Sequence, residues 1–483
     1  MNEKTTQLLR KALSNIDFFS DQNGNRHGIV TEGKKCTIID ISHNQISCWL
    51  RRLFLSTKDG VCSNSEIDLI TNYIESLAAD DSVEARPYFT RIGADDLALY
   101  YDLGNKGHDI VTISKDGGIK LIKNDKFDIC FKKVHPQVTP NLEVKPTQLF
   151  SLLKPFFHLK NETDFLLLLV YLVSCFLYDI NHPILILYGE AGSSKSSTIE
   201  AIGEIVDPHG AANRLTMNPD RKSMVATLSN RYFLGYDNLD CALKKWQSDL
   251  LCSASTGGSE PMRVLYTNNT LQEVNLKGCV CLNGLTIVAT EKDLLDRSIL
   301  IEMKKIPTEE YLPESDLKQK FENILPDVLG AIFNTLHIAM QFHVDLQPLA
   351  HGRMQDFAQW GFCIAQALGE KGEKFSKLYA TNTQCAQKES KLPLIQDCLT
   401  SLMCDQHEWS GSMTKLRDAL WTVAKSKSYK LSEFPANASV LSRQLGTNRQ
   451  ALEGQGISYV QHIGGDRHII IKNENVQEGL CFA

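Results

Sequence analysis

The sequence predicts an α/β protein with several domains, in which helices flank a largely parallel sheet. Three observations support this fold class. The length of 483 residues corresponds to about three domains of about 150 residues each. The composition, 43% apolar and 22% charged, is that of a globular chain and excludes wholesale disorder and collagen. In the middle of the chain, short apolar runs alternate with helical segments, which is typical of a parallel sheet.

Four segments differ in pattern. Residues 1–140 mix short alternating runs with turn signals and predict a small α+β domain of unknown role. Residues 141–310 carry the strand-and-helix alternation, residues 311–390 have helical spacing, and residues 391–483 form a C-terminal domain. Strands are expected at 36–41, 98–102, 109–114, 119–122, 184–188, 232–236, 279–282 and 298–303.

Charge, cysteine content and apolar run lengths bear on partners and location. The formal net charge of −6 neither requires nor excludes a polyanionic partner. Residues 1–10 lack the apolar part of a leader, and no run of about 18 apolar residues follows, so we expect a cytoplasmic protein without a membrane partner. The 14 cysteines contain no C-x-x-C pair and are expected to be reduced thiols, without disulfides or zinc.

A candidate phosphate loop follows the predicted strand 184–188. Two glycines would let the backbone turn its N–H groups inward, and the following helix would offer the positive end of its dipole to an anion. Lys195 would reach the β- and γ-phosphates, and the Ser196 hydroxyl would coordinate magnesium. The standard pattern G-x-x-x-x-G-K-[ST] has glycine where this chain has Ser194. The expected cofactors are ATP and Mg²⁺, and the candidate binding residues are Gly189, Glu190, Ala191, Gly192, Ser193, Ser194, Lys195, Ser196 and Ser197.

A carboxylate for the metal is expected at the end of a neighbouring strand. The apolar run 232–236 ends in Asp237, which would hold Mg²⁺ together with Ser196, although an aspartate here can also simply begin a turn. Asn238 stands where many such ATPases have a glutamate that polarises water. Either Asn238 orients water without acting as a base, or Asp240 helps.

Two more polar residues lie next to apolar runs. Asn283 ends the run 279–282 and would sense the γ-phosphate and orient water. Arg297 precedes the strand 298–303 and would complete the site of a neighbouring subunit, unless it only pairs with Asp293 or Asp296. The candidate catalytic residues are Lys195, Asp237, Asn238, Asn283 and Arg297.

In this order and spacing, the blocks G-E-A-G-S-S-K-S, F-L-G-Y-D-N, V-C-L-N-G and D-L-L-D-R-S resemble the Walker A, Walker B, sensor 1 and arginine-finger segments of AAA+ ATPases. Within these, the chain is similar to superfamily 3 helicases of phages, genomic islands and staphylococcal cassettes, and to poxvirus-type primase-helicases. The resemblance implies a P-loop AAA+ core. It also implies that a hairpin between Walker B and sensor 1, signalled by Asn268-Asn269, grips one DNA strand. Arg263, Tyr266 and Lys277 are its candidate DNA-binding residues.

The C-terminal segment has the order of a winged helix. Thr414 would cap a first helix, residues 438–445 would form a second, and Gly446 would turn into a third helix opened by Thr447. A hairpin at 459–463 and 467–471 would turn at Gly464-Gly465. Such a module can contact DNA or protein, and the DNA-binding candidates are Arg449 and Arg467, with Arg443, Asn448 and Gln450 beside them.

Together these features predict an ATP-dependent DNA helicase or translocase. It would act as a homo-oligomeric ring, expected to be a hexamer, on single-stranded or forked DNA during replication of a phage or mobile genetic element. Because residues 1–140 lack a carboxylate pair or zinc-ligand spacing, a primase is expected as a partner and not within this chain. Two alternatives stay open: an ATP-gated DNA-binding initiator that does not unwind, and a P-loop signalling ATPase or kinase without a nucleic-acid partner.

Overall fold

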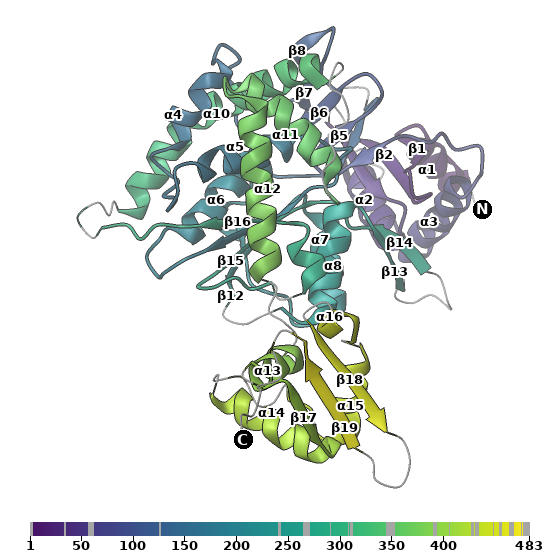
Figure 1. Cartoon of the computed structure of the whole chain (residues 1–483). Helices are drawn as coiled ribbons and strands as arrows, with labels where there is room; N and C mark the ends of the chain where they lie inside the picture. The colour runs from purple at the N-terminus through teal and green to yellow at the C-terminus, as the bar shows by residue number, and fades with distance from the viewer. Residues whose placement is uncertain are drawn as a thin grey trace, which may run out of the picture. The chain divides into compact units, whose positions relative to one another are not determined.

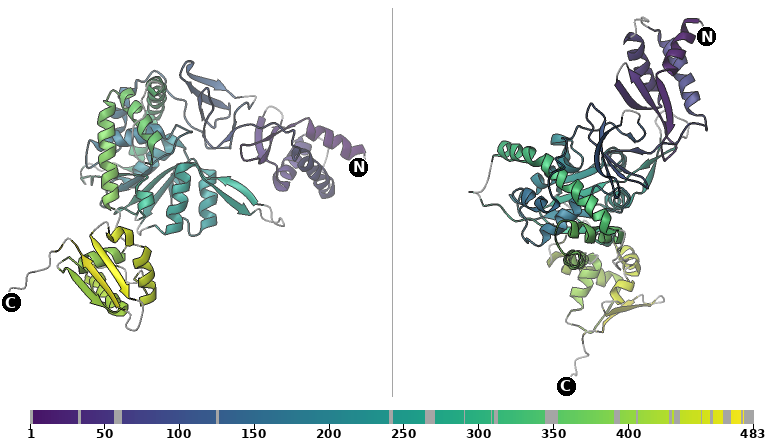
Figure 2. Two further views of the ribbon diagram at one scale, coloured as in Figure 1. Left: turned by 45° about the vertical axis from the view of Figure 1, so that its right-hand side comes forward. Right: turned by 90° about the horizontal axis from the view of Figure 1, so that it is seen from above.

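The computed structural model describes most of the chain, in two compact units that span residues 1–387 and 388–483. Figure 1 labels the elements, and Figure 2 shows them from two further directions. The residues that the structure does not describe are 1–2, 33–34, 57–61, 125–126, 240–242, 264–270, 290, 308, 310–312, 344–352, 390–393, 405, 427–428, 430–433, 448, 454–455, 463–467, 475 and 477–483.

The larger unit begins with three helices around a small antiparallel sheet. The order β1–β2–β3 is a meander, and the helices bury Trp49 and Ile46 against it. Ser63 and Glu66 form a capping box at the start of α3, which satisfies two backbone N–H groups there. The elements are α1 (Glu3–Leu13), β1 (Ile16–Ser20), β2 (Arg26–Glu32), β3 (Lys35–Asp40), α2 (His43–Ser56) and α3 (Asn64–Ala78).

A second antiparallel sheet has the order β5–β6–β7–β8, and the short strands β4 and β9, which pair in parallel, come before and after it in the chain. The strands predicted at 98–102, 109–114 and 119–122 are confirmed, with ends that differ by one residue at most. Ile92, Tyr101 and Val111 from this sheet join the same hydrophobic core as the central helices. The strands are β4 (Tyr88–Phe89), β5 (Ile92–Ala94), β6 (Leu99–Asp102), β7 (Asp109–Ser114), β8 (Gly118–Lys123) and β9 (Cys130–Phe131).

The central sheet is parallel throughout, in the order β11–β12–β15–β10–β16. Helices cover both faces, so the predicted α/β class is confirmed. The elements here are η1 (Pro146–Gln148), α4 (Leu149–Leu153), α5 (Asp164–Ser174), β10 (Ile184–Tyr188), α6 (Lys195–Val206), η2 (Gly210–Asn213), β11 (Arg214–Leu215), α7 (Arg221–Asn230), β12 (Phe233–Leu239), α8 (Lys245–Thr256), β13 (Ser259–Arg263), β14 (Leu271–Asn275), β15 (Cys279–Gly284), α9 (Lys292–Leu295) and β16 (Ser298–Glu302).

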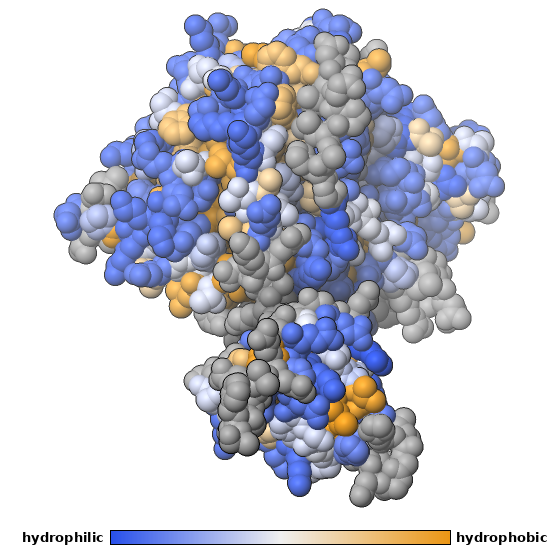
Figure 3. Space-filling view, in the orientation of Figure 1, coloured by the Kyte–Doolittle hydropathy of each residue, from blue (hydrophilic) through white to orange (hydrophobic). Residues whose placement is uncertain are grey.

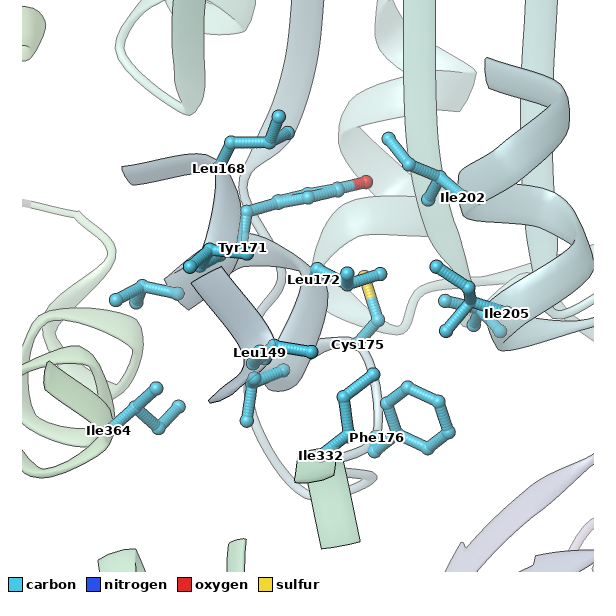
Figure 4. Close-up of a cluster of buried hydrophobic side chains, with 14 of the residues drawn as sticks. Leu149, Leu168, Tyr171, Leu172, Cys175, Phe176, Ile202, Ile205, Ile332 and Ile364 are labelled. Carbon is cyan, nitrogen blue, oxygen red and sulfur yellow. The ribbon is translucent and has the colours of Figure 1, made fainter. Parts of the chain in front are cut away.

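Alternate residues of β10 show how the sheet is buried on both sides. Leu185 and Leu187 face the core that contains α5 and α6, whereas Ile184 and Ile186 face the core that contains α7, α8 and α9. Burial on both faces explains why these strands are continuous apolar runs. Figure 4 shows the first core, where side chains of α4, α5, α6, α10 and α11 converge.

The described part of the larger unit ends with helices α10 (Glu314–His343), α11 (Gln355–Ala367) and α12 (Gly372–Glu389). They confirm the helical spacing of the third segment. Figure 3 shows that the visible face of this unit is mainly hydrophilic, with small separate apolar areas. Among the described helices, none combines the length and apolar character that a membrane crossing requires. The described cysteines are free thiols.

The described residues of the smaller unit form four helices that pack on a three-stranded antiparallel sheet, β17–β19–β18. Two local predictions are wrong. Ser412 and not Thr414 caps α14, because the Ser412 hydroxyl accepts from the Lys415 N–H at 3.2 Å. Gly446 lies inside α15 and makes no turn. The turn predicted at Gly464-Gly465 lies outside the described residues. The elements are α13 (Leu394–Leu402), β17 (Glu408–Gly411), α14 (Met413–Ser426), α15 (Ala438–Thr447), α16 (Arg449–Glu453), β18 (Ile457–His462) and β19 (His468–Asn473).

Candidate nucleotide-binding site

The loop between β10 and α6 has a backbone that most residues cannot adopt. Gly189 and Gly192 have φ of +146° and +78°. A Cβ on Gly189 would lie 2.6 Å from the carbonyl oxygen of Met303, so this position requires glycine. Ser194 has φ of +53° and is the N-cap of α6. The left-handed conformation at Ser194 explains why glycine is standard at this place in the motif, and the serine adopts it at some cost in strain.

Lys195 is folded into the loop. Its ammonium donates to the carbonyl oxygens of Gly189 and Glu190, both at 2.8 Å, and to the Ser193 hydroxyl at 3.2 Å. The residue is 8% exposed. Burial lowers the pKa of Lys195, while the nearby Asp237 raises it by a smaller amount. The positive charge of Lys195 is thus stabilised by uncharged carbonyl dipoles of the loop, at the position where a phosphate would bind.

Three segments meet on one carboxylate oxygen. Oδ1 of Asp237 accepts from the Ser196 hydroxyl at 2.9 Å, from the Asn238 N–H at 3.0 Å and from the Asn283 side-chain amide. These donors come from the start of α6 and the ends of β12 and β15. The ends of neighbouring parallel strands share one sheet edge, which is where ligands bind in open α/β sheets. The structure therefore brings together Lys195, Ser196, Asp237, Asn238 and Asn283.

The donor set fits a magnesium ion. A carboxylate, a hydroxyl and an amide oxygen are the hard oxygen ligands that Mg²⁺ prefers. Oδ1 of Asn283 is buried without a hydrogen-bond partner among the described residues, and a polar group of this kind calls for a ligand or water.

Asn238 sits on an irregular end of β12. Its φ is +52°, and the register between β12 and β15 shifts between Tyr236 and Leu239. Asparagine tolerates this left-handed conformation much better than most residues. The backbone conformation is thus one physical reason for asparagine at this position. Asp240, the predicted helper, lies outside the described residues.

A cavity of about 530 Å³ adjoins this cluster. Residues 191–197 of the loop line it together with Asn238 and Asn283. Sequence reasoning missed the remaining lining residues, because they come from distant segments without a motif. These are chiefly Phe156, His158, Arg214, Ile306 and Leu317. Arg214 pairs with Glu200 at 3.5 Å and leaves 41% of its side chain exposed.

Arg297 lies at the other edge of the sheet. Ser298 is opposite Ile184, the first residue of β10, whereas the phosphate loop follows Tyr188, the last. Five residues of strand, about 16 Å, separate the two edges. Arg297 forms an ion pair with Asp293, which also pairs with Arg353, and donates to the Asp293 carbonyl at 3.0 Å. The structure does not place Arg297 at the site built around Asp237.

The DNA-binding candidates are described only in part. Strands β13 and β14 form an antiparallel hairpin, but Tyr266 and the Arg263 side chain lie outside the described residues. The Lys277 ammonium lies 4.4 Å from the Tyr178 ring centre at the hairpin base, and burial lowers its pKa. Arg449 pairs with Glu453 at 3.0 Å, with its guanidinium 5.3 Å from the Tyr459 ring centre. Arg467 is not among the described residues.

Comparisons with solved structures return chains of low sequence identity. The apo structure of the NrS-1 C-terminal region is 11% identical, with a TM-score of 0.42, over 98% of this chain and 100% of that chain. A structure described as "SCCmec type IV Cch - active helicase" is 12% identical, with a TM-score of 0.46, over 95% and 94%. A JCV helicase structure is 14% identical, with a TM-score of 0.25, over 50% and 65%. No curated protein matches the chain in sequence.

Two family models match, and they agree with each other. Residues 150–376 match the replication protein of actinomycete integrative conjugative elements, and residues 395–478 match the C-terminal domain of the same kind of protein. Together the matched segments make up more than half of the chain. This agrees with the similarity of the motifs to replicative ATPases of mobile elements. The chain therefore belongs to the family of replication proteins of integrative conjugative elements.

Proposed function

We propose that this replication protein is an ATP-dependent DNA helicase or translocase that works as a homo-oligomeric ring, expected to be a hexamer. The observation that carries the proposal is the meeting of Ser196, Asn238 and Asn283 on Asp237, beside a phosphate loop and a cavity large enough for a nucleotide. The family match supports a role in the replication of a mobile element.

Each residue has a defined task in this proposal. Residues 189–197 hold the triphosphate, and Lys195 exchanges its carbonyl partners for phosphate oxygens. Ser196 and Asp237 hold Mg²⁺, which when bound neutralises charge on the phosphates. Asn283 and Asn238 orient the attacking water. Phe156, Ile306 and Leu317 offer the base an apolar surface in the same cavity.

The position of Arg297 supports a ring. Because this arginine lies at the sheet edge opposite its own phosphate loop, it is placed to serve the site of a neighbouring subunit and not its own. The hairpin residues Arg263, Tyr266 and Lys277 would grip one strand in the channel. We assign the C-terminal unit as a winged helix that contacts DNA through Arg449 and Arg467, since its element order is that of the motif.

The first test compares variants in ATP hydrolysis and strand displacement on forked DNA. Lys195→Ala is expected to reduce hydrolysis by about 10²-fold or more, because it removes a cation from the charge that develops on the phosphates. Lys222→Ala removes an exposed lysine of α7 and serves as the matched control. DNA-stimulated hydrolysis with strand displacement supports the proposal. Hydrolysis that is indifferent to DNA favours a signalling ATPase or kinase instead.

The second test mixes two inactive variants. Arg297→Ala lacks the proposed trans arginine but keeps its own loop, whereas Lys195→Ala has the opposite defect. In a mixed ring, some interfaces join an intact loop to an intact Arg297, so hydrolysis should return in part. Arg353→Ala, which removes the other partner of Asp293, controls for local disruption. Failure of the mixture to regain activity contradicts the trans role, provided that mass measurements with ATP and single-stranded DNA show rings.

One observation favours a second candidate function, an ATP-gated initiator that binds DNA without unwinding it. Asn238 carries a carboxamide, which cannot accept a proton from water as a glutamate can. Slow ATP hydrolysis would then set how long the protein stays bound to DNA. ATP-dependent DNA binding in the absence of strand displacement would identify this function.

A further inference from the structure

A groove of about 720 Å³ lies in the N-terminal third of the chain, apart from the nucleotide cavity and the β13–β14 hairpin. Its walls are β3, the turn between β6 and β7, the end of β8 and the segment after β9. This size is in the range of sites that bury a ligand. No motif in the sequence marks the groove, because its walls come from four separate segments.

The groove is positively charged. Lys106, Lys123 and Lys133 line it and are exposed, and none of them forms an ion pair with another described residue. Lys132 also lines it but donates to the Ser229 carbonyl at 2.8 Å, so it anchors the wall instead of offering a free charge. Among the described lining residues, Asp102 is the only carboxylate.

Asp102 does little to cancel this charge. It is buried, and its Oδ1 accepts from the Gly104 N–H at 2.9 Å. Burial raises the pKa of Asp102, so the surroundings disfavour its negative form. Among the described residues, these three ammonium groups have no ion-pair partner and face a groove lined by no exposed carboxylate, which is the electrostatic footprint of a polyanion site.

The apolar part of the lining indicates which kind of polyanion the groove binds. Ile38, Phe127 and Phe131 line the groove beside the lysines. The rings of His108 and Phe127 meet edge to face at 5.1 Å, and both residues have φ of +53°. Strained non-glycine residues of this kind cluster at ligand sites. A DNA duplex offers outside contacts mainly through its phosphates, whereas a single strand also offers unstacked bases to apolar and ring surfaces.

We propose that this groove binds a segment of single-stranded DNA, with Lys106, Lys123 and Lys133 on the phosphates and the His108 ring against a base. The groove is a second contact for the strand, separate from the hairpin, and it assigns a role to the N-terminal part of the chain. The proposal rests on the proposed function in one respect, namely that the partner is DNA.

The test measures binding of a fluorescent oligothymidylate to the full-length protein by anisotropy, across a range of salt concentrations. The groove variant is Lys106→Ala/Lys123→Ala/Lys133→Ala. The control variant, Lys115→Ala/Lys120→Ala/Lys222→Ala, removes three exposed lysines that do not line the groove. A single strand loses about 0.7 in the salt slope for each phosphate contact, so the groove variant should lower the slope by about 2 and the affinity at about 0.1 M salt by about 100-fold.

A further variant tests the base contact. His108→Gly removes the ring and keeps a residue that tolerates the backbone conformation. It should weaken binding by about fivefold or more without changing the salt slope, because stacking releases no counter-ions. Unchanged ATP hydrolysis without DNA would show that each variant is folded.

The outcomes separate this proposal from the proposed function. If wild type binds the oligonucleotide and the groove variant binds as the control does, the groove proposal is overturned and the helicase proposal stands. If wild type does not bind DNA, both fail. If oligoglutamate displaces the oligonucleotide from the groove at comparable concentration, the site accepts acidic protein segments and is not a DNA site.

Discussion

A buried ion pair joins Arg91, which precedes β5, to Asp207, which follows α6, and its removal gives the sharpest stability prediction. Arg91 and Asp207 are both 0% exposed. Arg91 Nε donates to Asp207 Oδ1 at 3.1 Å, and the other guanidinium nitrogens donate to the carbonyl oxygens of Asp102 at 2.9 Å and His135 at 2.6 Å. Arg91 thus connects three segments from one point.

Asp207, the other partner of the pair, also forms several hydrogen bonds. Asp207 Oδ2 accepts from the backbone N–H of Tyr232 at 2.9 Å and contacts His209 Nε2 at 3.1 Å. Arg91→Met would leave a buried carboxylate without its cation and two buried carbonyls without their donors. Removal of one partner of a buried pair costs about 3 to 5 kcal/mol. A loss of this size raises the equilibrium constant for local opening by about 10² to 4 × 10³-fold.

Hydrogen exchange measures this opening directly. Peptides that cover β6 and β7 should lose protection in Arg91→Met by the factor above, because the pair holds this sheet to the core. Arg52→Met is the matched control, since Arg52 pairs with Glu32 at 3.2 Å on the surface with 57% of its side chain exposed. Such a pair contributes about 0 to 1 kcal/mol. If Arg91→Met changes protection as little as Arg52→Met does, the reasoning is refuted.

The same pair predicts an acid transition. Burial by itself raises the pKa of Asp207, but the hydrogen bond with His209 and the charge of Arg91 outweigh it and lower the pKa to about 2 from 3.8. A carboxyl with a depressed folded-state pKa adds stability above its unfolded pKa and loses it as the pH falls through the folded value. About 2 kcal/mol should therefore disappear between about pH 5 and pH 2 in wild type. The loss should be smaller in Arg91→Met.

Three other predictions follow from single positions. Ser194→Gly should relieve the left-handed strain and raise the stability of the larger unit by about 1 kcal/mol, measured as a shift in urea midpoint; a lower midpoint would contradict the strain argument. Gly330→Ala should lower the free energy of unfolding by about 1 to 3 kcal/mol, because a Cβ would lie 1.7 Å from the Asn141 carbonyl oxygen. Gly210→Ala is the comparison, because no atom lies within 4 Å of its Cβ and the variant therefore tests left-handed strain alone. Burial lowers the pKa of His27, but its contacts with Asp21 and Asp40 raise it further, so the net shift is upward. The N-terminal sheet should therefore lose stability as the pH rises above about 6.5, and His27→Gln should abolish this dependence in thermal unfolding at a series of pH values.

The sequence by itself determined the parts of the site that depend on local pattern. The run 184–188 is strand β10, and Asp237 and Asn283 follow apolar runs. Because parallel strands end at a shared edge, polar residues at those ends had to converge.

Only the tertiary structure decided which distant segments join these residues. Phe156, His158 and Arg214 reach the nucleotide cavity, and four segments line the basic groove, although no spacing in the chain links them. Strands β1, β2 and β17 escaped prediction because neighbouring strands supply the pairing that their own composition does not signal. Periodicity reports how one element meets the core, whereas the contacts between elements depend on the packing of the whole chain.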